Sequence, residues 1–354
     1  MIDKDDLRAS VGAGILNERQ AAALSSLADS RRGVRETLAP TDEPFELFRG
    51  FNEVFIMVGL AILAAGWFGV VSLGLLADPA NLQFTILLAT GFSAAVIWVL
   101  SEYFIRRRRM VGPAIMLSIL FGGSCAFGLT QYFAQPFMLA QEDFSSLQLP
   151  GILAVAALLL FWARFRVPFA MALIALSLFV VALLFAAVRS GTPQSLSDVF
   201  LLSGEGAFAW ITLGLGLAIF AAAMAFDASD PHRVTLRSRQ GFWLHVVAAP
   251  AIVNTVSVTF LSMETVGANG LMIAFLAVIA VVAIVIDRRS FLMTAIGYTV
   301  ILSLTALEGE GIFSLVLALG VFMVLLGAFW ERIRGAIMRY LPLGGARRFL
   351  PPSF

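Results

Sequence analysis

The chain is organised around residues 226–260, which read FDASDPHRVTLRSRQGFWLHVVAAPAIVNTVSVTF. This stretch joins a polar, arginine-bearing loop to an apolar run that contains His245, Pro250 and Asn254. No other apolar segment of the chain combines an ionisable side chain, a helix breaker and an amide. An ionisable residue inside an apolar segment is a candidate functional residue, so His245 is the first candidate of this chain.

Composition indicates a membrane protein. Of 354 residues, 60% are hydrophobic and only 13% are charged, whereas soluble domains carry about 25% charged residues. Cys125 is the only cysteine, which excludes an intrachain disulfide or a cysteine metal cluster. No apolar segment typical of a signal peptide occurs in the first 50 residues, so we expect the first apolar segment to direct insertion itself.

Apolar runs alternate with short polar breaks from residue 54 onward. A helix needs about 20 apolar residues to cross roughly 30 Å of hydrocarbon, so the pattern predicts an all-α fold, a polytopic transmembrane bundle of about ten helices. The predicted spans are residues 54–76, 82–104, 110–133, 148–163, 168–188, 206–226, 241–262, 267–286, 291–307 and 312–330. The fourth and ninth are short.

The distribution of basic residues predicts the orientation. If both termini are cytoplasmic, every one of the 24 basic residues except Arg189 falls on the inner side of the membrane. The positive-inside rule therefore favours an even number of spans and a bacterial inner-membrane protein with cytoplasmic termini.

The predicted domains are residues 1–48, a cytoplasmic helical hairpin and linker; 49–330, the bundle; and 331–354, a basic tail. In the hairpin, Asn17 and Gln20 have the spacing of a capping box. A nucleic-acid-binding hairpin is disfavoured, because acidic residues outnumber basic ones in this region.

The tail is predicted to form a short interfacial helix that binds anionic lipids. Its apolar residues recur at helical spacing, and its arginines are expected to point away from them. The apolar set is Ile333, Ile337, Tyr340 and Leu341, and the basic set is Arg332, Arg334 and Arg339.

The candidate interior polar site consists of neutral side chains and one histidine. The predicted spans hold acidic or basic residues only at their edges, which disfavours a carboxylate-driven pump. The candidates are His245, Asn254, Ser257, Tyr298 and Thr299. Hydrogen bonding between helices accounts for the presence of each of these polar residues as well as ligand binding does. His245 and Asn254 are nine residues apart, which puts them on opposite faces of a straight helix. Pro250 is expected to kink its helix.

Motifs of catalysis and of cofactor binding are missing from the sequence. It contains no nucleophile elbow, HExxH or Walker loop, so we expect no enzyme, no cofactor and no metal site. His232, in Asp230-Pro231-His232, is interpreted as a turn residue.

Three segments of the chain are distinctive: GFNEVF at residues 50–55, FDASDPHRVT at 226–235 and FWLHVVAAP at 242–250. They resemble segments of uncharacterised polytopic inner-membrane proteins of Gram-negative bacteria, and the hairpin at 7–27 is similar to one that precedes membrane domains of unknown function. The resemblance implies a membrane fold and no particular activity. Asn254 stands where a second histidine would complete a paired-histidine metal site.

Two functions follow from these observations. The first is transport or sensing of a small neutral or cationic solute of unknown identity, with the candidate residues lining the interior. The second is a non-transporting scaffold that recruits a protein partner, or a second copy of the chain, through the hairpin and tail.

Overall fold

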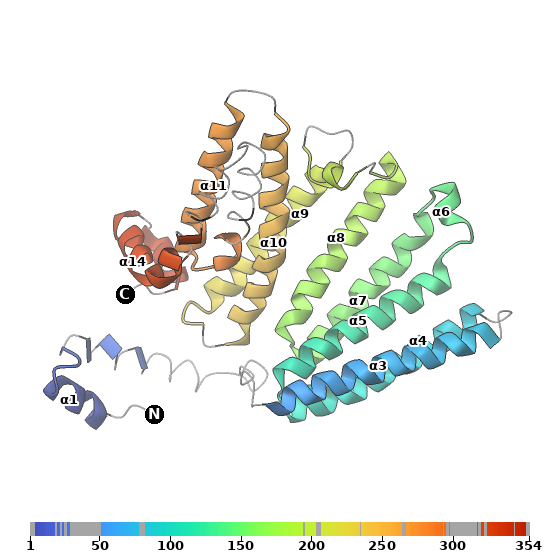
Figure 1. Ribbon diagram of the computed structural model, residues 1–354, viewed down its shortest axis with the longest axis horizontal. Coiled ribbons are helices and arrows are strands. Elements are labelled where there is room, and N and C mark those ends of the chain that lie inside the picture. The colour runs from blue at the N-terminus through green and yellow to red at the C-terminus, as the bar shows by residue number, and fades with distance from the viewer. Residues whose placement is uncertain are drawn as a thin grey trace.

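The computed structural model describes residues 4–17, 51–77, 82–193, 195–202, 207–233, 235–263, 267–292, 324–342 and 344–351, with a few single residues between them. Throughout this part of the chain the secondary structure is helical, and no strand occurs in it. The predicted all-α class is therefore confirmed (Figure 1).

The bundle is built from long apolar helices. They are α3 (Phe51–Ala77), α4 (Leu82–Ser101), α5 (Val111–Phe133), α7 (Gln148–Phe165), α8 (Pro168–Ser190), α9 (Phe208–Ser229), α10 (Leu236–Leu261) and α11 (Ala268–Val285). A π-helical segment, η2 (Glu102–Arg107), continues α4. The shorter elements are α1 (Lys4–Gly12), α6 (Met138–Gln141), η3 (Ser145–Leu147), η4 (Leu196–Val199), α14 (Trp330–Tyr340) and η5 (Gly344–Phe349).

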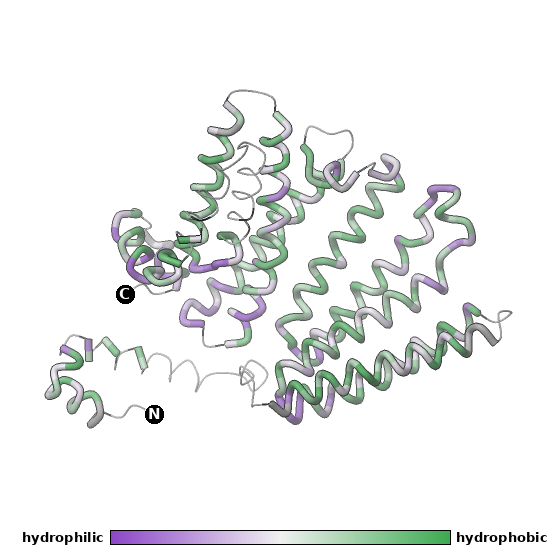
Figure 2. The backbone as a smooth tube through the Cα atoms, viewed as in Figure 1, coloured by the Kyte–Doolittle hydropathy of each residue, from purple (hydrophilic) through white to green (hydrophobic). Residues whose placement is uncertain are grey.

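Seven of these helices are long and apolar enough to cross a membrane, and they correspond to the first seven predicted spans. The eighth predicted span corresponds to α11, whose apolar part, Gly270–Val285, is shorter. Figure 2 shows apolar residues along the helices and polar residues gathered at their ends. The chain is therefore a multi-pass membrane protein. Most of the ninth predicted span and part of the tenth lie outside the described residues, so the count of ten stays a prediction.

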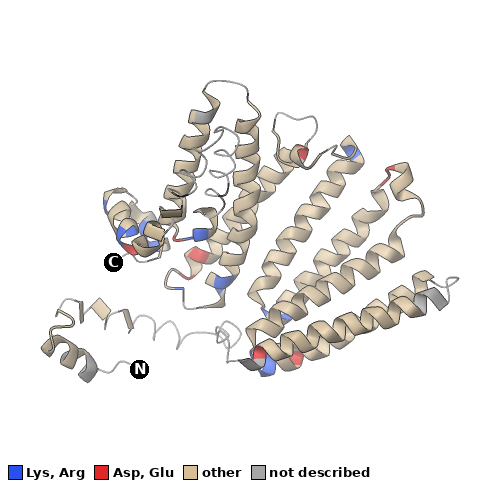
Figure 3. Cartoon of the chain, in the orientation of Figure 1, with Lys and Arg blue, Asp and Glu red and all other residues tan. Residues whose placement is uncertain are grey.

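The helices alternate in direction, and charged residues lie at their ends, where most of the arginines gather at one end together with several acidic residues (Figure 3). One end, called the basic end below, holds the start of α3 and the turns after α4, α7, α9 and α11. Its arginines are Arg106, Arg107, Arg108, Arg109, Arg164, Arg166, Arg233, Arg237, Arg239, Arg288 and Arg289. The turns at the opposite end hold Glu142, Asp143 and Asp198.

The loop between α9 and α10 is shorter than predicted. The helices end at Ser229 and begin again at Leu236, whereas the apolar pattern put the boundaries at residues 226 and 241. Thr235 is the reason for the early start, because its Oγ1 accepts a hydrogen bond from the amide of Arg237 at 3.0 Å and so caps α10. Polar residues that were assigned to a loop therefore belong to helices, and Asp227 lies within α9.

Buried side chains form two packing clusters. The first joins α8, α9, α10, α11 and α14, and includes Ala248, Met272 and Trp330. The second joins α3, α4, η2, α5 and α7 with the start of α8, and includes Phe161 and Leu236. Helices α8 and α10 contribute residues to both clusters. These two helices therefore join the halves of the bundle.

Pro250 lies inside α10, and the helix continues through it to Leu261. Proline removes one amide donor and leaves the carbonyl one turn earlier without its helical partner. Helix α10 nevertheless remains one element, and 15 of its residues are buried.

The C-terminal region packs on the bundle more closely than predicted. Helix α14 contacts α11, and Ile333 and Ile337 pack against the first cluster. The prediction that Arg334 points away with the other arginines is wrong, because Arg334 is 1% exposed whereas Tyr340 is 85% exposed. The reason is that Arg334 finds carbonyl acceptors within the protein, Ile284 O at 3.2 Å from Nε and Pro351 O at 2.5 Å from Nη2.

At the N-terminus, the two hydrogen bonds of the predicted capping box are present. The amide of Asn17 donates to Gln20 Oε1 at 3.0 Å, and the amide of Gln20 donates to Asn17 Oδ1 at 2.8 Å. Gly14, which precedes them, has a positive φ of 71°, which glycine adopts at little cost. The complete hairpin includes residues outside the described part of the chain and stays a prediction.

Candidate functional site

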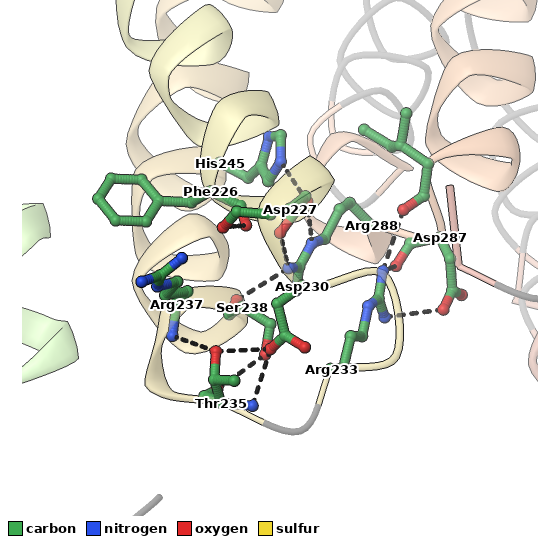
Figure 4. A network of polar contacts seen from close by, with 12 residues as sticks. Phe226, Asp227, Asp230, Arg233, Thr235, Arg237, Ser238, His245, Asp287 and Arg288 are labelled. Carbon is green, nitrogen blue, oxygen red and sulfur yellow. Dashed lines mark hydrogen bonds and ion pairs between the residues drawn. The ribbon is translucent and has the colours of Figure 1, made fainter. Parts of the chain in front are cut away.

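The strongest candidate site is a buried group of three ionisable side chains at the basic end (Figure 4). Asp227 comes from the last turn of α9, His245 from α10, and Arg288 from the turn that follows α11. We call these three residues the Asp227 cluster. All three are buried, and His245 is 0% exposed.

Asp227 accepts hydrogen bonds from both of its partners. His245 Nε2 lies 3.0 Å from Asp227 Oδ2, and Arg288 Nε donates to the same oxygen at 2.9 Å. Arg288 Nη2 donates to Asp227 Oδ1, so the guanidinium binds both carboxylate oxygens, which is the strong bidentate form of this ion pair. Arg288 Nη2 also donates to the carbonyl of Ser238 at 2.8 Å. The cluster therefore joins α9, α10 and the end of α11.

Gly241 makes room for the carboxylate. A Cβ atom at this position would lie 2.5 Å from Asp227 Oδ1 and 3.2 Å from the carbonyl oxygen of Ala223. Gly241 is one turn from His245, so the two residues share a face of α10. The glycine allows α9 and α10 to approach closely enough for Asp227 to bind both partners.

The imidazole of His245 has one satisfied and one unsatisfied nitrogen. Two aromatic rings meet it nearly edge-on, Phe220 with centroids 5.5 Å apart and Phe291 with centroids 5.8 Å apart. His245 Nδ1 is buried and, within the described residues, has no hydrogen-bond partner. A buried polar atom without a partner is uncommon in native proteins and calls for an explanation.

A second layer of polar contacts fixes the loop below the cluster. Asp230 Oδ2 accepts hydrogen bonds from the amide and the hydroxyl of Thr235, each at 2.8 Å. Arg233 Nη1 pairs with Asp287 Oδ2 at 2.7 Å, and Trp330 Nε1 donates to Asp287 Oδ1 at 2.7 Å. Burial lowers the pKa of Arg233 from its usual value, with the charge of Arg288 acting in the same direction. The loop 230–235, the end of α11 and the start of α14 are thus connected.

Of the predicted site residues, only His245 belongs to the cluster. Asn254 and Ser257 lie farther along α10; Asn254 is half-buried and Ser257 is fully buried. Ser257 Oγ is also without a partner in the described part of the chain, as is Thr212 Oγ1 on α9. Tyr298 and Thr299 lie outside the described residues, so the prediction that they line the interior is not tested.

Asp227 and Arg288 were missed because the predicted spans excluded them. Asp227 was expected just past the end of the span 206–226, but it lies within the last turn of α9 and is 5% exposed. A usable signal was present in the sequence: a carboxylate directly after one apolar run, a histidine in the next, and a glycine four residues before that histidine. Arg288 could not be assigned this way, because sequence spacing does not bring α11 to the α9–α10 pair.

The chemistry available to the cluster is proton exchange and hydrogen bonding. Among the described residues, no group of three or more histidine, cysteine, aspartate or glutamate side chains is placed to hold a metal ion. The cluster combines an anion, a cation and a titratable imidazole, which is the composition of a proton relay or of a buried structural ion pair.

Comparison with known proteins does not separate these two roles. No protein-family model matches the chain, and neither the curated proteins nor the solved structures gave a match. The function therefore has to be argued from the geometry of the site.

Proposed function

We propose that this chain is a transport-like membrane protein that moves or senses a small neutral or cationic solute, and that the Asp227 cluster makes it responsive to protons. The observation that carries the proposal is His245, a fully buried imidazole with Nε2 on Asp227 and Nδ1 without a partner in the described residues. Leaving a buried acceptor unsatisfied costs about 1–3 kcal/mol. A proton or a donor group of a solute at Nδ1 would remove that cost.

The charges of the cluster select the tautomer of His245. Asp227 binds Arg288 through both oxygens, so it is a carboxylate and accepts hydrogen bonds only. His245 Nε2 must then carry the hydrogen, which leaves the Nδ1 lone pair open. A proton bound at Nδ1 makes the ring cationic, and the ring then competes with Arg288 for Asp227. Because the three residues lie on different elements, this competition changes the forces between α9, α10 and the end of α11.

The variant His245→Gln tests this role. A glutamine amide can still donate to Asp227, but it has no group that titrates near neutral pH. We reconstitute the full chain in liposomes that contain a pH-sensitive dye, impose a pH gradient, and add sugars, neutral amino acids and amines in turn. We expect at least one of these classes to produce proton movement with the unmodified protein and none to do so with His245→Gln.

His232→Gln is the matched control, because His232 is the other histidine of the chain and is exposed in the loop between α9 and α10. It should behave as the unmodified protein. Equal proton movement with His245→Gln and with the unmodified protein would contradict the role of the cluster. Absence of movement with every solute class would contradict transport itself.

We further propose that the protein resides in a bacterial inner membrane with the basic end in the cytoplasm, as the positive-inside rule indicates. The gathering of arginines at one end, with Arg189 alone among the described arginines at the other, supports this orientation. Reporter fusions after His232 and after Phe354 should both report a cytoplasmic position, and a fusion after Asp143 should report the opposite side. Fusions after His232 and Phe354 that report different sides would refute the even number of spans.

A scaffold is the second candidate function. The observation that favours it is the exposure of aromatic side chains in the C-terminal region, 85% for Tyr340 and 45% for Phe349. Exposed aromatic residues are common in protein interfaces. A scaffold would give no proton movement in the liposome experiment.

A further inference from the structure

The turn between α4 and α5 has an unusual backbone. The π-helix η2 (Glu102–Arg107) widens the end of α4: the amide of Arg108 donates to Tyr103 O at 3.0 Å and that of Met110 to Phe104 O at 3.1 Å. Arg109 then adopts a left-handed φ of 51°. Such π-helical turns are rare and frequently occur at functional sites.

This turn presents four consecutive arginines, and a carboxylate compensates only part of their charge. Arg106 bonds to Glu102 at 3.4 Å, but Glu102 also accepts from Arg164 Nε at 2.8 Å. One negative charge is therefore shared between two arginines. A second carboxylate, Glu53, accepts a hydrogen bond from the amide of Gly112 at 3.2 Å. Four consecutive arginines and Arg164 outnumber these two carboxylates, so the turn keeps an excess of positive charge.

Arg108 is held by a neutral partner. Its Nε and Nη2 both donate to the hydroxyl of Tyr103 at 3.2 Å, and its guanidinium carbon lies 5.6 Å from the centre of the Tyr103 ring. These contacts orient the guanidinium without neutralising it. Arg108 Nη1 takes no part in them and can donate to a ligand.

Tyr103, Arg107 and Arg108 line an open cavity of about 400 Å³. Within the described part of the chain, the side chain of Arg107 makes no hydrogen bond and no ion pair with another residue, and it is exposed. Two guanidinium groups beside one cavity suit a phosphate, because arginine can bind phosphate oxygens in a bidentate manner.

An apolar surface leads along α4 to this cavity. Leu88, Phe92, Val99 and Tyr103 are exposed by 57%, 57%, 67% and 41%. Their spacings of four, seven and four residues place them on one face of the helix. In a membrane this face lies against lipid, so a molecule with a phosphate joined to an apolar chain fits the cavity and the face together.

We propose that Tyr103, Arg107 and Arg108 bind the phosphate of an anionic phospholipid whose acyl chain lies along α4. The site is on different helices from the Asp227 cluster, so the proposal is independent of the proposed function. The apolar face beside the cavity favours a lipid over free phosphate, and the net positive charge of the turn favours an anionic headgroup over a zwitterionic one.

Native mass spectrometry of the full chain, released from detergent micelles, tests the proposal. The probes are phosphatidylglycerol, phosphatidylcholine and inorganic phosphate. We expect the unmodified protein to retain phosphatidylglycerol in preference to phosphatidylcholine. Arg107→Gln and Arg108→Gln should each weaken this retention by about tenfold or more, since each removes charge-assisted hydrogen bonds. Tyr103→Phe should have a smaller effect, because it frees Arg108 without removing its charge.

Arg189→Gln is the matched control, because Arg189 is an exposed arginine in the last turn of α8, at the end opposite the basic end. It should retain phosphatidylglycerol as the unmodified protein does. Equal retention of the two lipids, or unchanged retention by Arg107→Gln, would overturn the proposal. Displacement of the lipid by millimolar inorganic phosphate, with phosphate itself bound by the unmodified protein and lost in Arg107→Gln, would identify free phosphate as the ligand and overturn the assignment to a lipid.

Discussion

Replacing Asp227 with alanine should lower the free energy of unfolding by about 3–5 kcal/mol, the usual effect of removing one partner from a buried ion pair. Arg288 is 6% exposed and binds Asp227 through Nε and Nη2. Without the carboxylate, its charge would remain buried with only the carbonyl of Ser238 as a partner among the contacts described for it. The measurement is an unfolding titration of the full chain in mixed micelles with increasing denaturing detergent.

Two further variants separate the loss of charge from the loss of packing. The double variant Asp227→Ala, Arg288→Met removes both charges and should recover most of the lost stability, because no unpaired charge is left in the interior. Glu142→Ala alters an exposed glutamate at the opposite end and should change stability by less than about 0.5 kcal/mol. If the single variant Asp227→Ala were as stable as the unmodified protein, the carboxylate would not be the counter-charge of Arg288.

Replacing Arg334 with methionine should release the C-terminal segment from the bundle. Arg334 is 1% exposed and donates hydrogen bonds to the carbonyls of Ile284 and Pro351, so it ties α14 to the end of α11 and to the residues after η5. Methionine keeps most of the apolar side chain and removes the donors. A hydrogen bond to a charged group contributes about 1.5–3 kcal/mol. Tryptic cleavage after Arg347 and Arg348 should therefore become roughly tenfold to a hundredfold faster.

Arg332→Met is the matched control, since Arg332 lies in the same helix, is exposed, and stacks over Phe329 with its guanidinium carbon 5.6 Å from the ring centre. Its effect on cleavage should be small. Cleavage of Arg334→Met at the rate of the unmodified protein would show that the apolar face of α14, rather than Arg334, holds this region in place.

The class of the fold could be predicted from the sequence, because the length of an apolar run and the spacing of arginines depend on the bilayer rather than on tertiary contacts. The boundaries around the loop 230–235 could not. Hydropathy ends a helix where polar residues begin, but the cap at Thr235 starts α10 among polar residues. Thr235 is a residue type that commonly caps helices, so its position was the one local signal that α10 begins at Leu236.

The candidate site could be predicted only in part. His245 stood out as an ionisable residue in an apolar run, whereas its partners depend on which helices pack together. In the chain, Asp227 is 18 residues from His245, and Arg288 is 61 residues from Asp227. The face of Arg334 was predicted wrongly for the same reason. Helical spacing predicts which residues share a face of the helix, but it does not predict which backbone carbonyls of other elements that face will contact. Contacts of this kind follow from the tertiary arrangement of α11 and α14.

The division of α10 between the two packing clusters has a mechanical consequence. Leu236, its first residue, packs with Phe161 and the α3–α7 half, whereas Leu244, Val247 and Ala248 pack with α9 and α11. A movement of α10 would therefore displace residues of both packing clusters at once. Helix α10 carries the buried His245 and also packs against the α3–α7 half of the bundle. A change of charge at His245 that moves α10 would therefore also move its contacts with that half.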